Sequence, residues 1–336
     1  MMRPKLTFAF DPHKTRHVFD HGAMERLEAC CEVLSSAPLT SFGTPEARAM
    51  LTQTNILVTG WGCPMLTPDV LRAAPGLQLV AHAAGTVKFT VDPTAYASGI
   101  RVTHAAEANA VPVAEFTLAT ILLANKRIFE LRDLYRADPT RRSSYELMDH
   151  PLGNFRRTVG LVGASRIGRK VAAMLSGFDF EVLLYDPFVQ PDDPIARQVS
   201  LVDLDTLMAR SDVVSIHAPS LPNTRGMIGA RQLKLMQDGA AFINTARGAL
   251  VDEAALLAEL QTGRIHAVID VTDPEIPPAD SPFFSLPNVF LTPHVAGAIG
   301  AERARLGLMA VEEVERFVRG EPMLYEIEPE LLERLA

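Results

Sequence analysis

The chain of 336 residues has room for about two domains with substantial cores, which excludes a peptide-sized or disulfide-stapled scaffold. Hydrophobic residues make up 48% of it and charged residues 21%, a composition that excludes a disordered chain. The 32 basic and 40 acidic residues give a net charge of −8 without a basic stripe, so nucleic acid is not an expected partner.

The N-terminal end carries no recognisable targeting signal. Met1–Lys5 lacks an apolar core, and no run of about 18 apolar residues, the length of a membrane span, occurs in the chain. The three cysteines, Cys30, Cys31 and Cys63, have neither an even count nor the spacing of a metal site. We therefore expect a soluble protein of the reducing cytoplasm, with no membrane partner and no metal.

Short apolar runs bounded by turn residues alternate with longer amphipathic segments along most of the chain. This alternation is typical of an α/β fold with parallel strands, and the number of runs suits two sheets. The predicted strands are Leu6–Phe10, Asn55–Val58, Leu77–Ala81, Thr158–Val162, Glu181–Tyr185, Val213–Ile216, Ala241–Asn244, Ala267–Ile269 and Val289–Leu291.

Three histidines follow the first predicted strand at regular intervals. His13, His17 and His21 recur every four residues, with Asp20 beside the last. On a helix these side chains would share one face and could bind a metal ion. Gly22 is expected to stop such a helix, so we favour an exposed entry loop.

Three longer segments lie outside the predicted strands. Residues 111–124 predict a helix that is apolar nearly all round, which belongs between domains or in an oligomer interface. Residues 136–154 are polar and contain proline, so we expect an extended arm or loop. Residues 305–336 predict an amphipathic helix and a charged end that packs back onto the N-terminal domain.

A turn with Gly163, Ser165 and Gly168 separates the strand Thr158–Val162 from a predicted helix. In dinucleotide-binding folds three glycines at this spacing allow a tight turn, admit the pyrophosphate and let the helix pack on the strand. Ser165 replaces the second glycine, so its Cβ crowds the approach, although its hydroxyl could donate to a phosphate. The turn therefore predicts a dinucleotide site with a weakened signature.

Asp186 ends the next predicted strand, Glu181–Tyr185. A carboxylate at this position accepts hydrogen bonds from the adenosine ribose and repels a 2′-phosphate. The pattern therefore favours NAD over NADP.

Arg247, Glu275 and His294 each follow a predicted strand by a few residues. Because the carboxyl ends of parallel strands face the ligand crevice, we expect the three side chains to meet. A guanidinium can bind a carboxylate with two bonds, an imidazolium can protonate a developing alkoxide, and a carboxylate can orient the imidazole. Each residue alone has an ordinary structural explanation, but together they are the groups that reduction of a 2-keto acid requires.

From about Ala81 to Gly300 these segments resemble the D-isomer-specific 2-hydroxyacid dehydrogenase family. The resemblance implies that Arg247 binds the substrate, that Glu275 is the partner carboxylate and that His294 is the acid/base. It also implies cofactor contacts at the turn and at the later strand ends, namely from Gly163, Ser165, Arg166, Ile167, Gly168, Asp186, His217, Pro219, Thr224, Thr245, Ala246, Arg247, Asp270, His294 and Gly297.

The resemblance implies two doubly wound parallel-sheet domains and a homodimer. A Rossmann-type NAD-binding domain, residues 105–304, would be inserted into a flavodoxin-like substrate (catalytic) domain made of residues 1–104 and 305–336. In the latter, backbone N–H groups of the turn with Gly85 and Thr86 could bind the substrate carboxylate. The family commonly has a small acidic or amide residue where this chain has Lys88. Lys88 could pair with a second anionic group on the substrate, but we favour a solvated lysine or a structural ion pair.

We therefore expect an NAD-dependent oxidoreductase that transfers a hydride between nicotinamide and a small D-2-hydroxy acid or 2-keto acid. Glyoxylate, hydroxypyruvate and phosphoglycerate-type compounds are the candidate substrates. The alternative is an NAD(H)-binding regulatory or scaffold protein with the same fold. The joint presence of Arg247, Glu275 and His294 argues against it, because a sensor needs only the cofactor half of the site.

Overall fold

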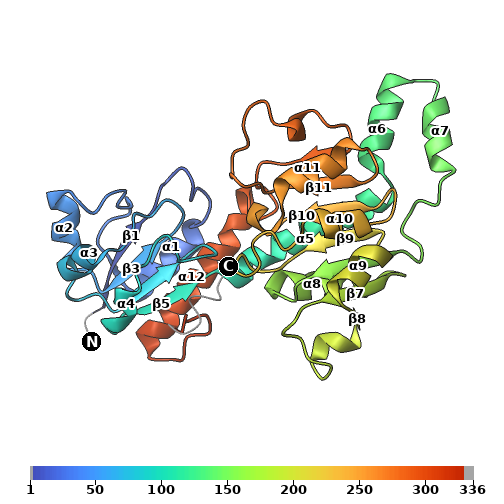
Figure 1. Ribbon diagram of the computed structural model, residues 1–336. Coiled ribbons are helices and arrows are strands. Elements are labelled where there is room, and N and C mark those ends of the chain that lie inside the picture. Colours follow the sequence, from blue (N-terminus) through green and yellow to red (C-terminus); the bar gives the residue numbers. More distant parts are fainter. Residues whose placement is uncertain (1–2, 329–336) are drawn as a thin grey trace. The chain divides into compact units, whose positions relative to one another are not determined.

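The computed structural model describes residues 3–328 and divides into two compact units (Figure 1). Unit 1 holds the described residues up to Asn109 and from Ala298 onward, and unit 2 holds Ala110–Gly297. The chain therefore crosses between the units a few residues away from the domain boundaries predicted at 104/105 and 304/305. The first two residues and the charged end, residues 329–336, lie outside the described part.

Unit 1 is built on a parallel sheet with the strand order β2-β1-β3-β4-β5, the flavodoxin-like order of doubly wound folds. Its strands are β1 (Lys5–Ala9), β2 (Glu32–Val33), β3 (Ile56–Thr59), β4 (Leu79–His82) and β5 (Arg101–His104). Its helices are α1 (His21–Cys30), α2 (Pro45–Leu51), α3 (Pro68–Ala73), α4 (Thr94–Ala97) and α12 (Ala304–Arg319), with a short 3-10 helix, η4 (Gly300–Arg303).

Alternating side chains of the unit 1 strands cover two faces, as the period of a strand requires. Leu6 and Phe8 pack with Leu27 of α1 and Val311 of α12 on one face. The next residues along each strand pack with α2, α3 and α4 on the other. The predicted C-terminal helix thus returns to the N-terminal segment, where Arg26 also donates two hydrogen bonds to Glu315 at 2.8 and 2.9 Å.

Unit 2 contains a parallel sheet with the order β12-β11-β10-β9-β6-β7-β8, which is the Rossmann order with one added strand. Its strands are β6 (Thr158–Val162), β7 (Glu181–Tyr185), β8 (Ser200–Leu201), β9 (Val213–Ile216), β10 (Ala241–Asn244), β11 (His266–Ile269) and β12 (Val289–Leu291). Its helices are α5 (Ala106–Asn125, begun in unit 1), α6 (Ile128–Ala137), α7 (Arg142–Met148), α8 (Arg166–Leu175), α9 (Leu204–Arg210), α10 (Ala230–Leu235) and α11 (Glu253–Gln261), with 3-10 helices η1 (Pro194–Arg197), η2 (Gly248–Leu250) and η3 (Pro282–Phe284).

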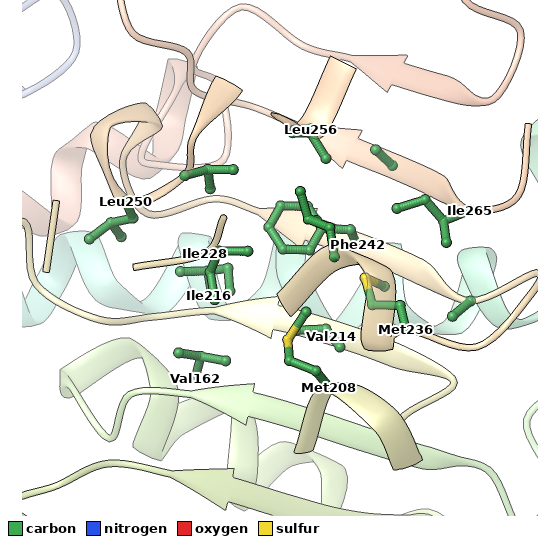
Figure 2. Close-up of a cluster of buried hydrophobic side chains, with 14 of the residues drawn as sticks. Val162, Met208, Val214, Ile216, Ile228, Met236, Phe242, Leu250, Leu256 and Ile265 are labelled. Carbon is green, nitrogen blue, oxygen red and sulfur yellow. The ribbon is translucent and has the colours of Figure 1, made fainter. Parts of the chain in front are cut away.

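Two apolar clusters hold the unit 2 helices against its sheet. Figure 2 shows the one under α9, α10 and α11, where Phe242 of β10 is surrounded by Met208, Met236 and Leu256. On the opposite face, side chains of the same strands pack with α5 and α8. Both faces of the sheet are covered, which explains why its strands are continuous apolar runs in the sequence.

Helix α5 is long and apolar enough, by length and composition alone, to cross a membrane. Its contacts are those of a core helix: Ala114 and Ile121 are fully buried against the unit 2 sheet. The hydroxyl of Thr117, which also belongs to α5, lies 3.0 Å from the hydroxyl of Thr245, which follows β10. We therefore assign α5 to the core of the fold.

All nine predicted strands are present within a few residues, but three further strands were not predicted. Two of them, β2 and β8, are only two residues long, too short to give a periodic pattern. The third, β5, has a half-polar sequence that gives no apolar run, and its edge is covered by residues near Tyr325: the His104 amide donates to the Tyr325 carbonyl at 3.2 Å.

Two predictions about helices were wrong. Gly22 does not stop a helix; it lies in the first turn of α1, because Asp20 caps the helix by accepting from the Ala23 amide at 2.8 Å. The arm predicted over 136–154 as extended or irregular contains the end of α6 and all of α7. Asp138 accepts hydrogen bonds from the amides of Thr140 and Ser143, which organises the turn between these two helices.

Candidate active site

The predicted site residues of unit 2 follow strands that end at one edge of its sheet. The strand register places the last residues of neighbouring strands opposite one another, in the order Tyr185, Val162, Ile216, Asn244, Ile269 and Leu291. The loops that leave these positions carry, in the same order, Asp186, Gly163, His217, Arg247, Glu275 and His294. The carboxyl edge of the sheet therefore gathers residues that are as far apart in the sequence as Gly163 and His294.

The turn after β6 is as tight as its glycines predict. Gly163 has φ +101°, and a Cβ built on it would lie 2.6 Å from the Ala218 amide nitrogen. A Cβ on Gly168 would lie 2.2 Å from the Gly163 carbonyl oxygen. Neither position can hold a larger residue without moving backbone, so both glycines are required by the turn itself.

Ser165, which replaces the second glycine, is the N-cap of α8. Its hydroxyl oxygen accepts a hydrogen bond from the Gly168 amide at 3.4 Å. A serine cap satisfies one amide of the first helical turn and leaves the helix N-terminus available for an anion. The serine is thus accommodated as a cap, a role that the sequence comparison with a glycine did not reveal.

Asp186 fastens this turn to the end of β7. One oxygen accepts from the Ala164 amide at 2.7 Å, and the other accepts from the Phe188 amide at 2.8 Å. The carboxylate thus lies beside the glycine turn, and the turn and Asp186 form one local unit.

His217 follows β9 and is buried beside the same turn. Its Nε2 lies 2.9 Å from the Ser215 hydroxyl, and its Nδ1 has no hydrogen-bond partner among the described residues. Burial lowers the pKa of His217 to about 3, so the ring is neutral at physiological pH. Farther along this loop, Thr224 donates to the Pro219 carbonyl at 2.6 Å, which closes a compact turn.

Arg247 lies in a loop that is fixed by the side chain of Asn244. The Asn244 amide donates to the Arg247 carbonyl at 2.9 Å, and its oxygen accepts from the Ala246 amide at 3.1 Å. Burial lowers the pKa of Arg247, and the charge of Glu275 opposes that shift. An arginine remains protonated under all ordinary conditions, so the site contains a partly buried positive charge near a carboxylate.

Glu275 and His294 are brought together although nineteen positions separate them. The Glu275 carboxylate oxygen Oε1 lies 2.5 Å from His294 Nδ1. Both side chains are about half exposed in this chain. His294 has φ +55°, a left-handed conformation that is uncommon outside glycine and is found at functional sites. The contact leaves the other ring nitrogen, Nε2, for a substrate.

Asp270 has a structural role, holding the loop of His294, that the sequence did not indicate. It is buried at the end of β11, and its carboxylate accepts hydrogen bonds from the Thr292 hydroxyl and from the Val295 and Ala296 amides. Both oxygens are thereby used to hold the loop that contains His294. Its position directly after a buried strand was the available sequence signal.

In unit 1 the turn with Gly85 and Thr86 follows β4, at the carboxyl edge of that sheet. His82 lies beneath it: its Nδ1 is 2.9 Å from the Thr59 hydroxyl, and the ring is also bonded to the Thr86 backbone. Burial lowers the pKa of His82 to about 4. Lys88 is half buried, and within residues 3–328 its ammonium group forms no ion pair, so the structural ion pair that was considered is absent there.

The histidines near the N-terminus do not assemble. His13 and His17 lie in turns before α1 and only His21 is helical. In the described part of the chain, no group of three or more His, Cys, Asp or Glu side chains is arranged to hold a metal ion.

Comparison with known proteins adds to this geometry. Residues 118–296 match the family described as D-isomer specific 2-hydroxyacid dehydrogenase, NAD binding domain. The chain belongs to the D-isomer specific 2-hydroxyacid dehydrogenase family. The sequence resemblance is thereby confirmed, together with NAD as the cofactor class and the two-domain doubly wound fold.

Two relatives of the family and one solved structure illustrate the match. D-3-phosphoglycerate dehydrogenase of Mycobacterium leprae is 37% identical over 279 residues, covering 82% of this chain and 50% of that protein. Glyoxylate reductase of Thermofilum pendens is 33% identical over 329 residues, covering 96% and 93%. A phosphoglycerate oxidoreductase from Rhizobium etli shares the fold with a TM-score of 0.80 at 23% identity, covering 97% of this chain and 99% of that one.

The chain spans about half the length of the first phosphoglycerate dehydrogenases that it matches, 50% and 48%, but nearly all of the glyoxylate reductase. The fold and the NAD-binding region of the family are therefore shared, whereas the substrate differs among relatives. Substrate choice has to be argued from the residues of this chain.

Proposed function

We propose that this chain is an NAD-dependent oxidoreductase that interconverts a small 2-keto acid and its D-2-hydroxy acid. The observation that carries the proposal is the Glu275–His294 contact at 2.5 Å near the partly buried charge of Arg247. A protein that only sensed NAD(H) would need the glycine turn and Asp186, but it would have no use for an oriented imidazole.

In this proposal Arg247 binds the substrate carboxylate through its guanidinium, whose two parallel donors match the two oxygens. Bound NADH supplies a hydride to the keto carbon. His294 donates the proton that the developing alkoxide requires, through the nitrogen that does not face Glu275. Glu275 fixes the ring orientation through its contact with Nδ1. In the opposite direction the neutral ring accepts the hydroxyl proton.

The residues of the unit 2 sheet edge fit an NAD molecule. The N-terminus of α8, capped by Ser165, suits the pyrophosphate, as do Arg166 and Ile167 in its first turn. Asp186 lies within the same unit and would bind the adenosine ribose while repelling a 2′-phosphate, which favours NAD over NADP. We assign contacts along the NAD to His217, Pro219 and Thr224, contacts near the nicotinamide to Thr245, Ala246 and Asp270, and a further cofactor contact to Gly297.

We propose unit 1 as the substrate (catalytic) domain and unit 2 as the NAD-binding domain. The backbone amides of Gly85 and Thr86 are the carboxylate-binding groups of unit 1 in this account, supported by the neutral His82 that holds their turn. In this proposal the ammonium group of Lys88 is solvated and does not bind the substrate. Glyoxylate, hydroxypyruvate and phosphoglycerate-type compounds are the proposed substrates; the relatives described above are a phosphoglycerate dehydrogenase and a glyoxylate reductase.

The test is the loss of NADH absorbance when the protein receives glyoxylate, hydroxypyruvate, pyruvate, branched 2-keto acids and a phosphorylated 2-keto acid in turn. We expect turnover with at least one small 2-keto acid, and its loss in His294→Asn. NADH binding without turnover of any of these compounds would contradict the proposal and favour an NAD(H)-binding regulatory or scaffold protein.

We also propose a cytoplasmic homodimer. Helix α6 has no buried residue, and the apolar side chains Ile128, Tyr135, Tyr145 and Met148 of α6 and α7 are exposed. Sedimentation equilibrium would decide the oligomeric state: a monomer at micromolar concentration would contradict the dimer, and charge substitutions at Tyr135 and Met148 should dissociate it.

A further inference from the structure

The loop that carries Glu275 is stabilised by hydrogen bonds from the buried side chain of Thr272. This residue is only 7% exposed, and its hydroxyl oxygen lies 2.8 Å from the Pro274 carbonyl and 3.2 Å from the Glu275 carbonyl. The hydroxyl therefore donates to the backbone at and directly before Glu275. A buried hydroxyl with these partners fixes the path of the backbone from which the Glu275 side chain projects.

The same loop is packed against the loop that carries Arg247. A Cβ built on Gly248 would lie 2.1 Å from the carbonyl carbon of Thr272, 2.4 Å from its oxygen and 2.5 Å from the Asp273 amide nitrogen. All three atoms belong to backbone, so they cannot yield as the end of a flexible side chain would. The residue after Arg247 is thus in direct contact with the backbone that precedes Glu275.

The outer side of the loop is held by weaker contacts. The Asp273 amide donates to Glu253 at 3.0 Å, and Arg225 pairs with the Asp273 carboxylate at 2.7 Å. The Arg225–Asp273 pair is largely exposed, and exposed ion pairs contribute little. The buried contacts of Thr272 and Gly248 are therefore the main determinants of where Glu275 lies.

From this packing we infer that Thr272 and Gly248 are positioning residues of the reaction: they hold Glu275 against His294 and join the Arg247 and Glu275 loops into one rigid element. The inference rests on the proposed function for its kinetic consequences. It goes beyond that function by assigning roles to two residues that touch neither substrate nor cofactor in the proposal. Its physical basis is that a carboxylate can orient an imidazole only if its own backbone is fixed.

The test compares Thr272→Val, which keeps the shape and removes the hydroxyl, with Thr272→Ser, which keeps the hydroxyl. Thr272→Val should lower kcat/KM for reduction about tenfold, less than the hundredfold that a displacement of one ångström can cause. It should also alter the pH profile of reduction, whereas Thr272→Ser should restore both properties. The dissociation constant of NADH, followed by fluorescence, should be the same in all three proteins.

A double-mutant cycle decides whether Thr272 acts through Glu275. In the Glu275→Gln background the Thr272→Val change should have no further effect on kcat/KM, because there is no longer a carboxylate to position. Independent, multiplying losses would overturn the inference. If Thr272→Val does not fold, Thr272→Ala tests the same contacts, and retention of wild-type kinetics and pH profile in either variant would also overturn it.

An activity-independent measurement separates this inference from the proposed function. The chemical shift of the His294 ring proton resonance, assigned by its absence in His294→Asn, reports the contact with Glu275 without substrate. Thr272→Val should move this chemical shift in the direction of Glu275→Gln. An unmoved resonance in an active enzyme would refute the positioning role alone, whereas a moved resonance without turnover of any 2-keto acid would refute the proposed function alone.

Discussion

The carboxylate of Asp270 holds the loop on which His294 is presented. It accepts a hydrogen bond from the Thr292 hydroxyl at 2.6 Å and from the Val295 amide at 2.8 Å, one residue on either side of the Pro293–His294 pair. The Asp270 carbonyl accepts from the His294 amide itself at 2.9 Å. A buried acid thus closes the loop around the left-handed backbone of His294, and so supports a conformation that costs about 1–3 kcal/mol.

Replacement of Asp270 by Asn should therefore disturb catalysis through the loop that carries His294. One oxygen becomes an NH2 group that faces amide donors, and a buried donor left unsatisfied costs about 1–3 kcal/mol of stability. We expect a fall in kcat/KM with an increased urea sensitivity. Thr292→Val, which removes only one of the bonds, is the matched control and should have a smaller effect on both. Equal effects of the two variants would contradict this role.

Arg247→Lys keeps the positive charge and removes the planar pair of donors. Since a single ammonium cannot bind both oxygens of a carboxylate in the same geometry, kcat should fall as well as substrate affinity. Steady-state kinetics with the best 2-keto acid measure this change. Kinetic constants within about twofold of the wild type would show that the Arg247 guanidinium does not bind both oxygens of the substrate carboxylate.

Asp186→Ser should weaken NADH binding and reduce the preference of the protein for NADH over NADPH. Two effects combine: the phosphate repulsion disappears, and the turn loses the 2.7 Å bond from the Ala164 amide. Asp186→Asn, whose side-chain oxygen can still accept that bond, should keep more of the NADH affinity and lose the discrimination. Fluorescence titrations with both cofactors measure the ratio of the NADH and NADPH dissociation constants. An unchanged ratio in both variants would exclude Asp186 as the residue that binds the adenosine ribose.

The lowered pKa of the buried His82 ring predicts that the protein loses stability on acidification. Its pKa is about 4 in the folded chain, below the 6.5 of an exposed histidine, so between these values the unfolded chain binds a proton that the folded chain does not. Stability therefore falls as the pH decreases from 6.5 to about 4, by about 2 kcal/mol at pH 5 for such a shift. His82→Gln can keep the hydrogen bonds without titrating. Urea midpoints at pH 7 and pH 5 should differ less in this variant than in the wild type.

The positions of the central strands and the residues at their carboxyl ends could be predicted because buried parallel strands are continuous apolar runs, as in Val213–Ile216. Elements without such runs could not: β5 takes part of its stability from residues more than two hundred positions later, and α7 depends on the turn at Asp138. In the site, the approach of Glu275 to His294 followed from strand ends alone. The supporting contacts of Asn244, Asp270 and Thr272 depend on loop geometry, which the position of a polar residue after a strand does not specify.

The central claim is that Glu275 and His294 act as a pair in proton transfer, and the pH dependence of kcat/KM in both directions tests it most directly. Reduction requires the protonated ring and oxidation requires the neutral ring, so the activities should fall on opposite sides of the same pH. Glu275→Gln keeps the shape of the side chain and removes the charge that faces His294 Nδ1, so the pH profiles of reduction and oxidation should change together. Unchanged profiles in both directions would exclude Glu275 as the partner, and a wild-type profile flat between about pH 5 and 9 would exclude His294 as the acid/base.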